Sequence, residues 1–319
     1  MARIDNESGL LVIGEDENGS RLDRVLMREL GQERRSLILR LIRKGNVRIN
    51  RKRAKPESRL ASGDLIFLPA SLRQPAEPSS DSSDIPSSLL KKVADIPVLF
   101  EDEHLLIVDK PAGMVVHGGS GYGAGLIEAL KADRHLPDLR LAHRLDRDTS
   151  GVLLMAKNLV SLRQLTEAFR ERNMQKTYFA LVADHPFAHA GRMQSKLVKG
   201  LISGGERMVS DSEDGKEAVT DYQVSMLFEQ DGFRYALLAL NPHSGRTHQL
   251  RVQLADEGHA ILGDGKYGIR TDNQTFKRMG GKGLALHAWR LRFMHPASSK
   301  SMELRALLPN DWFKVLKDE

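Results

Sequence analysis

Residues 142–156 read AHRLDRDTSGVLLMA, in which a polar stretch with two carboxylates runs directly into five apolar residues. The terminal run VLLMA predicts a buried strand, because short apolar runs bounded by polar residues are typical of strands covered on both faces. Asp146 and Asp148 would then lie at the mouth of that strand, close to Arg144 and Arg147. Two interpretations are open: a surface ion-pair cluster, or an ionised carboxylate held ready for chemistry.

The segments around this stretch predict a sheet with few helices. Apolar runs with the composition of strands occur at 104–113, 178–182, 233–240 and 284–293. Residues 159–173 carry apolar side chains at helical spacing and predict a helix. Because strands and helices do not alternate regularly, the fold class predicted is α+β, with a mixed, largely antiparallel sheet.

The N-terminal part predicts a small helical and hairpin unit. Apolar residues at helical spacing predict one helix over 20–30, with Ser20 as its N-cap, and a second over 34–45, with Gly45 as its C-cap. Short strands should follow at 46–53 and 63–68. Such a unit is small for independent stability and fits an appended binding module.

Positive charge is concentrated in this unit. Residues 21–70 hold 14 Lys and Arg against 5 Asp and Glu, a balance of +9, whereas the whole chain carries +6 and the remainder therefore −3. The basic residues with few neighbouring carboxylates are Arg34, Arg35, Arg40, Arg43, Lys44, Arg48, Arg51, Lys52, Arg53 and Lys55. This distribution predicts phosphate-backbone binding rather than a role in solubility alone. Few aromatic residues accompany it, which favours recognition of folded RNA shape over base stacking.

Composition divides the chain and excludes several classes of protein. Residues 71–88 contain seven Ser and three Pro and predict a linker. The expected organisation is an N-terminal segment (1–19), a basic RNA-binding domain (20–70), a linker (71–93) and a larger domain (94–319). Cys is absent, no metal-ligand spacing occurs, and neither a signal peptide nor a long apolar segment is present. We therefore expect a cytoplasmic protein without a metal or a membrane partner.

Two further stretches contain candidate functional residues. The Gly-rich run 117–125 fits no nucleotide-binding pattern, so we expect a mobile loop at the edge of a cleft. In 241–259, Arg246 lies in a predicted turn and Arg251 in the helix that follows it. Arg251 could extend its charged end to solvent, or be held inward by a carboxylate such as Asp146. A reactive carboxylate must stay ionised in a dry pocket, and a fixed guanidinium favours the ionised form.

These stretches together resemble a known family. HRLDRDTSG at 143–151 is similar to the signature of the RluA-type pseudouridine synthases. Four companions follow the family's order: DKPAGMVVHGG (109–119), QKTYFALV (175–182), GRTHQLRV (245–252) and LHA (286–288). The basic unit resembles the S-four-type RNA-binding domain of ribosomal origin. The resemblance covers nearly the whole chain and is strongest to the RluC branch.

The resemblance implies a role for individual residues. Asp146 matches the essential carboxylate, and Arg144 the Arg that takes the place of the flipped nucleotide. Tyr178 matches the Tyr that stacks on uracil and is implicated in proton removal, and Arg251 the Arg paired with the catalytic Asp. Further substrate contacts are expected from His143, Thr149, Arg246, His248 and Leu286. Gln253 departs from the family, where a His often stands, without affecting a catalytic position.

The resemblance also implies the reaction and the partner. It implies isomerisation of specific uridines in bacterial large-subunit ribosomal RNA, by base flipping, by a monomer without a cofactor. The Asp could attack the anomeric carbon, add to the uracil ring or remove a ribose proton. Two other classes stay open: a non-catalytic RNA-binding or ribosome-assembly factor, and a nucleoside or glycoside hydrolase, which usually needs a second carboxylate.

Overall fold

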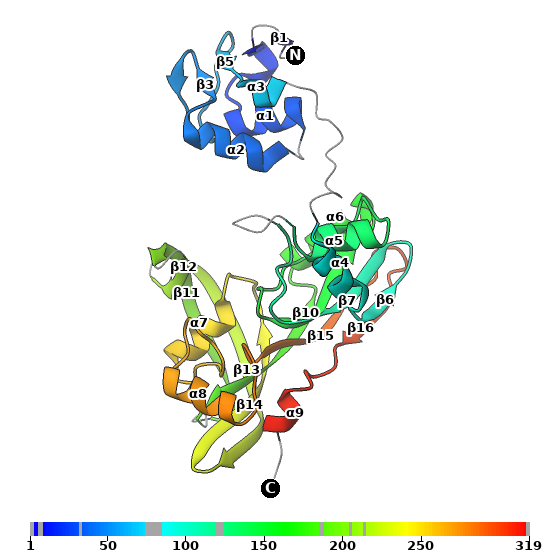
Figure 1. The fold of residues 1–319 in the computed structure, drawn as a ribbon, viewed down its shortest axis with the longest axis vertical. Coiled ribbons are helices and arrows are strands. Elements are labelled where there is room, and N and C mark those ends of the chain that lie inside the picture. The colour runs from blue at the N-terminus through cyan, green and yellow to red at the C-terminus, as the bar shows by residue number, and fades with distance from the viewer. Residues whose placement is uncertain are drawn as a thin grey trace. The chain divides into compact units, whose positions relative to one another are not determined.

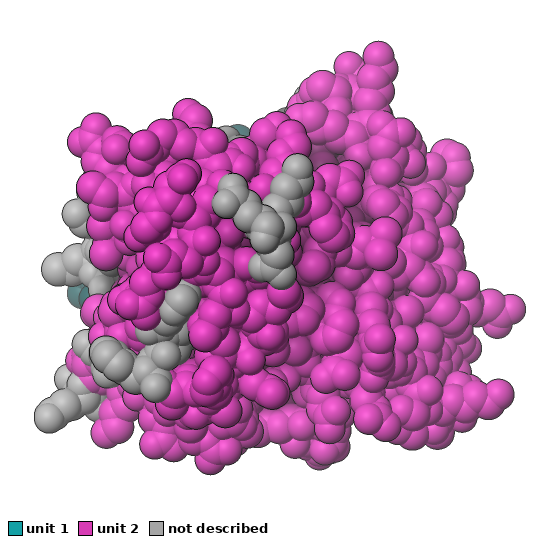
Figure 2. Space-filling view, turned by 90° about the horizontal axis from the view of Figure 1, so that it is seen from below, with its two compact units in different colours: residues 1–84 teal, residues 85–319 magenta. Residues whose placement is uncertain are grey.

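The computed structural model describes residues 3–5, 9–31, 34–73, 85–118, 124–184, 188–203, 206–212 and 215–316. The chain divides into two compact units, residues 1–84 and 85–319. Figure 2 shows one face of the second unit. Each unit has apolar clusters of its own. Among the helices of these ranges, none is long and apolar enough to span a membrane.

The first unit packs two helices on a small sheet (Figure 1). Its elements are β1 (Arg3–Asp5), β2 (Leu10–Val12), the 3-10 helix η1 (Glu15–Glu17), α1 (Leu22–Leu30), α2 (Arg35–Lys44), β3 (Arg48–Ile49), β4 (Lys52–Arg53), β5 (Leu65–Phe67) and α3 (Ala70–Arg73). The strand order is β1-β2-β5-β3-β4. The apolar positions of the predicted helices, including Leu26 and Ile42, are buried against Ile66 of β5. The helices therefore cover one face of this sheet.

The ends of these helices test two capping predictions. Gly45 follows α2 in the left-handed conformation, and its N–H donates to the carbonyls of Leu41 and Ile42, which confirms the predicted C-cap. The N-cap prediction for α1 is wrong, because Arg21 rather than Ser20 occupies that position. Arg21 instead donates to the Asp23 carboxylate at 3.0 and 2.7 Å, and Asp23 lies favourably in the first turn of the helix.

The second unit is built on one large sheet. Its strands are β6 (Val98–Glu101), β7 (Leu105–Lys110), β8 (Arg140–Leu141), β9 (Ser150–Ala156), β10 (Gln175–Ala183), β11 (Ala190–Ser203), β12 (Glu206–Asp211), β13 (Lys216–Gln230), β14 (Phe233–Pro242), β15 (Leu286–Met294) and β16 (Ser301–Arg305). Its helices are α4 (Ser87–Ala94), α5 (Leu126–Asp133), α6 (Leu159–Arg170), α7 (Gln249–Asp256), α8 (Arg270–Arg278) and α9 (Trp312–Val315). Helix α6 packs on β8 and β9, and α7 packs on β11 and β12.

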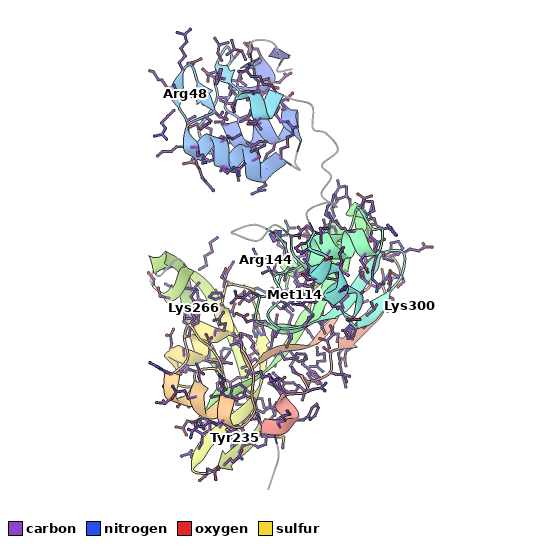
Figure 3. The ribbon with its side chains drawn as sticks, in the orientation of Figure 1. Arg48, Met114, Arg144, Tyr235, Lys266 and Lys300 are labelled. Carbon is purple, nitrogen blue, oxygen red and sulfur yellow. The ribbon has the colours of Figure 1, made fainter. Side chains whose placement is uncertain are left out.

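Strand pairing confirms the predicted fold class. The main path of the sheet is β12-β11-β13-β14-β10-β15-β9-β7-β6, with β16 beside β15 and β8 beside β9. All its pairings are antiparallel except that of β9 with β15, where Ser150 lies opposite His287 and Gly151 opposite Ala288. Tyr235 of β14, labelled in Figure 3, is buried and donates to the carbonyl of Val315 in α9 at 2.6 Å. The last helix is thereby fixed to the centre of the sheet.

The predicted linker, 71–93, is only partly described. Residues 74–84 lie outside the described residues, as do 119–123 of the Gly-rich run. Helices α3 and α4 extend into the two ends of the predicted linker, and Val93 of α4 is fully buried in an apolar cluster with α5. The second unit therefore begins before residue 94, where the sequence placed the domain boundary.

Candidate active site

The loop before β9 separates the two carboxylates seen in the sequence. Asp148 accepts hydrogen bonds from Arg147 at 3.0 and 3.1 Å, and this pair is exposed. The carbonyl of Asp146 accepts the N–H of Thr149 at 3.2 Å, which closes a turn. The Asp146 side chain is 32% exposed, and its Oδ2 lies 3.9 Å from Nε2 of the His248 ring. An ion-pair cluster therefore accounts for Asp148 but not for Asp146.

The strands β10 and β15 bring apolar side chains to the same place. Tyr178 lies on β10 opposite Leu240 of β14, and Leu286 is the buried first residue of β15. Burial raises the pKa of the Tyr178 phenol, and the nearby charge of Asp146 raises it further. The phenol is therefore protonated at neutral pH and can donate a hydrogen bond.

Helix α7 buries Arg251, but not against the predicted carboxylate. Arg251 Nε and Nη2 each donate to Asp264 at 2.7 Å, in a bidentate pair with both side chains buried. Burial alone would lower the pKa of Arg251, and the hydrogen bonds to Asp264 outweigh it and raise the pKa. The charge of Asp146 acts in the same direction from a longer distance. The expectation of a direct pair with Asp146 is thus corrected: Asp264 orients Arg251.

These residues line one cavity of about 210 Å³. The predicted site residues that line it are Arg144, Asp146, Thr149, Tyr178, Arg246, His248, Arg251 and Leu286. Four segments distant in sequence therefore meet there: the loop before β9, the strand β10, the turn leading into α7, and the strand β15. Asp146 lies among an aromatic ring, an imidazole and a guanidinium, at the edge of the cavity rather than deep within it.

The predicted residue His143 lies behind this cavity. Its Nε2 accepts the backbone N–H of Leu154 in β9 at 3.0 Å, and its ring contacts Phe169 of α6. Burial lowers the pKa of His143 to about 3, and the charge of Lys176 adds to the effect. A neutral His143 thus ties the start of the Asp146 loop to the strand, which is a different position from the substrate contact that the resemblance implied.

Two cationic residues of the cavity differ in their surroundings. Arg144, labelled in Figure 3, is exposed and has no ion pair in the described ranges, so its guanidinium is available to a ligand. Lys176, which the sequence reading missed, is half-buried and donates to the Ser244 carbonyl at 3.0 Å. Burial lowers the pKa of Lys176 to about 8. Its signal in the sequence was only its place two residues before Tyr178.

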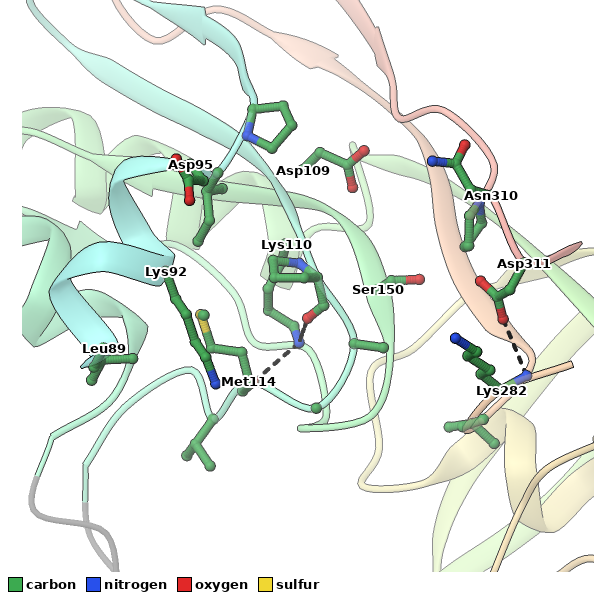
Figure 4. A pocket seen from close by; sticks show the side chains of 18 of the residues that line it. Leu89, Lys92, Asp95, Asp109, Lys110, Met114, Ser150, Lys282, Asn310 and Asp311 are labelled. Atoms are coloured by element: carbon green, nitrogen blue, oxygen red, sulfur yellow. Dashed lines mark hydrogen bonds between the residues drawn. The ribbon is translucent and has the colours of Figure 1, made fainter. Parts of the chain in front are cut away.

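A larger cavity of about 1180 Å³ contains none of the predicted site residues (Figure 4). It is connected to the site by Lys110, whose buried ammonium donates to the carbonyls of Pro111, Met114 and Arg147 at 2.9, 3.1 and 2.9 Å. Lys110 therefore supports the loop that carries Asp146 from behind. In the described part of the chain, no three acidic or His side chains gather in a group that could hold a metal ion.

The predicted RNA-binding residues of the first unit are mostly exposed. The exposed ones are Arg35, Arg40, Arg43, Lys44, Arg48, Arg51, Lys52 and Arg53. Arg34 is half-buried and donates to the Leu72 carbonyl at 3.3 Å. Arg48 and Arg53 donate to the carbonyls of Gly45 and Lys44 at the end of α2, a favourable position for cations. Within the part of the first unit that the structure describes, most of these side chains are exposed and form no ion pair with a carboxylate.

Comparison with known proteins gives two family matches. Residues 104–256 match the family described as RNA pseudouridylate synthase, and residues 20–66 match the S4 domain. The chain is 42% identical over 306 residues to a Yersinia pestis protein named ribosomal large subunit pseudouridine synthase C, covering 94% of this chain and 92% of that protein. It is 40% identical over 305 residues to the Escherichia coli K12 protein of the same name, covering 93% and 92%.

Two solved human structures resemble the second unit's fold. RNA pseudouridylate synthase domain containing 4 is 29% identical, with a TM-score of 0.58 over 72% of this chain and 94% of that one. RNA pseudouridylate synthase domain containing 1 is 25% identical, with a TM-score of 0.58 over 68% and 85%. Both likenesses agree with the α+β fold.

Proposed function

The chain belongs to the RNA pseudouridylate synthase family, and from this premise we propose that it converts specific uridines of bacterial large-subunit ribosomal RNA into pseudouridine. The observation that supports this most is the carboxylate of Asp146, which lies 3.9 Å from the His248 ring in a cavity shared with Tyr178 and Arg251. The relatives named as large-subunit enzymes support the choice of RNA.

The reaction breaks the bond between uracil N1 and ribose C1′, rotates the base and joins C5 to C1′. The proton lost from C5 balances the one gained at N1, so neither redox chemistry nor net hydrolysis occurs. We therefore expect no metal or cofactor, and we expect the protein to act as a cytoplasmic monomer. Attack of Asp146 on C1′, its addition to the uracil ring and removal of a ribose proton all remain open.

Each residue of the cavity has a physical task in this proposal. A stacked uridine must be extruded, at a cost of a few kcal/mol. Arg144 offsets part of that cost by entering the vacated space and contacting phosphates or bases. Tyr178 holds the detached uracil against its ring while the base turns. The buried positive charge of Arg251, fixed by Asp264, favours the ionised form of Asp146.

The first test is Asp146→Asn, with Asp148→Asn as a matched control two residues away. We expect Asp146→Asn to abolish pseudouridine formation in a large-subunit RNA transcript, a loss of more than about 10³-fold, while RNA affinity is retained. Asp148→Asn removes an exposed ion pair and should leave the rate nearly unchanged. Comparable turnover by both variants would reject the assignment.

Product analysis in the same assay separates the alternative functions. Release of free uracil would indicate a hydrolase, whereas RNA binding without any change in uridine would indicate an assembly factor. Mapping pseudouridines in ribosomal RNA from cells with and without the protein would then identify the target positions.

A further inference from the structure

His248 occupies an unfavourable backbone conformation at the edge of the active-site cavity. It precedes α7 as its N-cap residue, with φ 54° and ψ 19°, in the left-handed region that residues other than Gly rarely adopt. Its side chain caps no backbone N–H of the helix. Strained residues of this kind persist where surrounding contacts hold them, and they are concentrated at functional sites. The conformation therefore raises the question of what holds the imidazole in place.

The imidazole is fixed by Tyr267. Tyr267 Oη lies 2.8 Å from His248 Nδ1 and accepts the backbone N–H of Val209 in β12 at 3.1 Å. The two rings meet edge to face, with centroids 5.6 Å apart. The Arg251 guanidinium lies over the Tyr267 ring, 5.2 Å from its centroid. Tyr267 is thus held by groups from β12 and α7, and it presents its hydroxyl to the imidazole.

The hydrogen-bonding partners determine which ring nitrogen carries the proton. The Tyr267 hydroxyl oxygen already accepts the Val209 N–H. Within the described ranges, the acceptor that the Tyr267 hydroxyl proton can reach is His248 Nδ1. A hydroxyl that donates to Nδ1 leaves the proton of a neutral ring on Nε2. Nε2 faces Asp146 Oδ2 at 3.9 Å, where a bare lone pair would be repelled by the carboxylate. The hydrogen bond from Tyr267 and the charge of Asp146 therefore both favour the Nε2–H tautomer of His248.

The charge state of the ring is consistent with this arrangement. Burial lowers the pKa of His248, Asp146 and Asp264 oppose this effect, and the positive charges of Arg251 and Lys266 add to it. The net shift of the pKa is downward, so the ring is neutral at pH 7. A neutral ring carries one N–H, and the tautomer decides whether that N–H is on Nδ1 or on Nε2.

We propose that His248, held in its Nε2–H tautomer by Tyr267, orients the Asp146 carboxylate for reaction. His248 and Tyr267 are thus positioning residues: the first acts on Asp146 and the second acts on His248. The gap of 3.9 Å exceeds a hydrogen bond and closes when substrate fills the cavity, as catalytic contacts commonly tighten on binding. This inference rests on the proposed role of Asp146.

The test compares variants that remove the donor with one that replaces it. Gln places an amide N–H near the position of His Nε2, and that N–H needs no tautomer partner. We expect His248→Ala and Tyr267→Phe each to lower the single-turnover rate by about 10- to 100-fold at saturating RNA, with RNA affinity within about two-fold of the wild type. His248→Gln should keep most of the activity, and Tyr267→Phe should have no further effect in that background.

His243→Ala is the matched control, because His243 lies on the same turn, pairs with Asp221 and does not line the cavity. It should react at the wild-type rate. An unchanged rate in His248→Ala would overturn the inference. So would a Tyr267→Phe effect of equal size in the wild-type and His248→Gln backgrounds, because Tyr267 would then have only a structural role. If Asp146→Asn were as active as the wild type, the proposed function itself would fail.

Discussion

At the residue scale, the active-site loop depends on a buried ammonium whose hydrogen bonds, among the described residues, go to backbone carbonyls. Lys110 is fully buried, and its three hydrogen bonds join the residues after β7 to the carbonyl of Arg147. Burial lowers its pKa to about 8, while the charges of Asp148 and Asp146 oppose the shift. The cost of burying this charge is offset by three carbonyl acceptors and by the nearby acidic loop.

Lys110→Met should therefore loosen the loop that carries Asp146. Met has a similar length but leaves three carbonyls without their donor, so we expect a loss of about 2–4 kcal/mol in unfolding free energy and a lower rate of pseudouridine formation. Urea denaturation and the single-turnover rate measure the two effects. Lys92→Met is the control, because Lys92 is exposed at the rim of the same larger cavity. Equal stability of both variants would contradict the role given to Lys110.

His143 makes stability depend on pH. Its folded pKa, about 3, lies below the ordinary value of 6.5, so between these values the unfolded chain binds a proton that the folded chain does not. This contribution to stability is complete above pH 6.5 and is lost as the pH falls toward 3. At pH 5 the loss from this ring alone is at most about 2 kcal/mol.

His143→Gln, which keeps an acceptor for the Leu154 N–H, should flatten this dependence. Unfolding free energies of wild type and variant should converge as the pH is lowered from 6.5 to 5. A constant difference over that range would show that His143 titrates in the folded protein much as it does in the unfolded chain.

The sequence predicts those residues of the candidate site that belong to a recognisable motif, but not the contacts between separate segments. The residues around Asp146, Tyr178 and Arg251 were found from motifs, but the partner of Arg251 was not. Asp264 stands between Gly263 and Gly265, outside every stretch for which the sequence predicted a role, and its carboxylate is buried by the fold. Its two hydrogen bonds to the backbone of Lys266 and Tyr267 are formed only in that turn.

At the element scale, strands with a continuous apolar run could be predicted from the sequence, whereas strands with scattered apolar residues could not. β7, β9, β14 and β15 were predicted because their side chains are buried on one or both faces. β13 was missed, because most of its fifteen residues are half-buried or exposed and its apolar residues do not form one run. The parallel pairing of β9 with β15 could not be predicted either, since it joins residues far apart in the sequence.

That parallel pair depends on Gly151. Its φ of +110° is unfavourable for other residues, and a Cβ there would lie 2.2 Å from the Ala288 carbonyl oxygen. Gly151→Ala should therefore force β9 from β15 and disturb the loop ending at Thr149. We expect a loss of about 2–4 kcal/mol in stability and a reduced reaction rate.

The variant Gly232→Ala measures the cost of a positive φ without the steric contact that Gly151→Ala would make. Gly232 has φ +75° in the turn between β13 and β14, and its Cβ would meet nothing within 4 Å. We expect this variant to lose only about 1 kcal/mol in thermal or urea unfolding and to keep its activity. An equal loss in the two variants would mean that φ, not the contact with Ala288, explains the need for Gly151.

At the scale of the whole molecule, binding and chemistry are assigned to different units. The basic side chains of α2, β3 and β4 belong to residues 1–84, whereas the cavity around Asp146 belongs to residues 85–319. The second unit has its own apolar clusters. The charge distribution in the sequence leads to the same proposal, because the balance of +9 in residues 21–70 exceeds the +6 of the whole chain.

Residues 85–319 alone should therefore retain the chemistry and lose salt-sensitive affinity. Each phosphate contact contributes about 0.7–0.9 to the slope of log affinity against log salt concentration, so loss of about four contacts lowers the slope by about 3. At saturating RNA, the rate of pseudouridine formation should stay within about ten-fold of the full chain. Binding titrations at several salt concentrations measure the slope. An unchanged slope would place the main RNA contacts on the second unit and leave the exposed Arg and Lys of the first without the role proposed here.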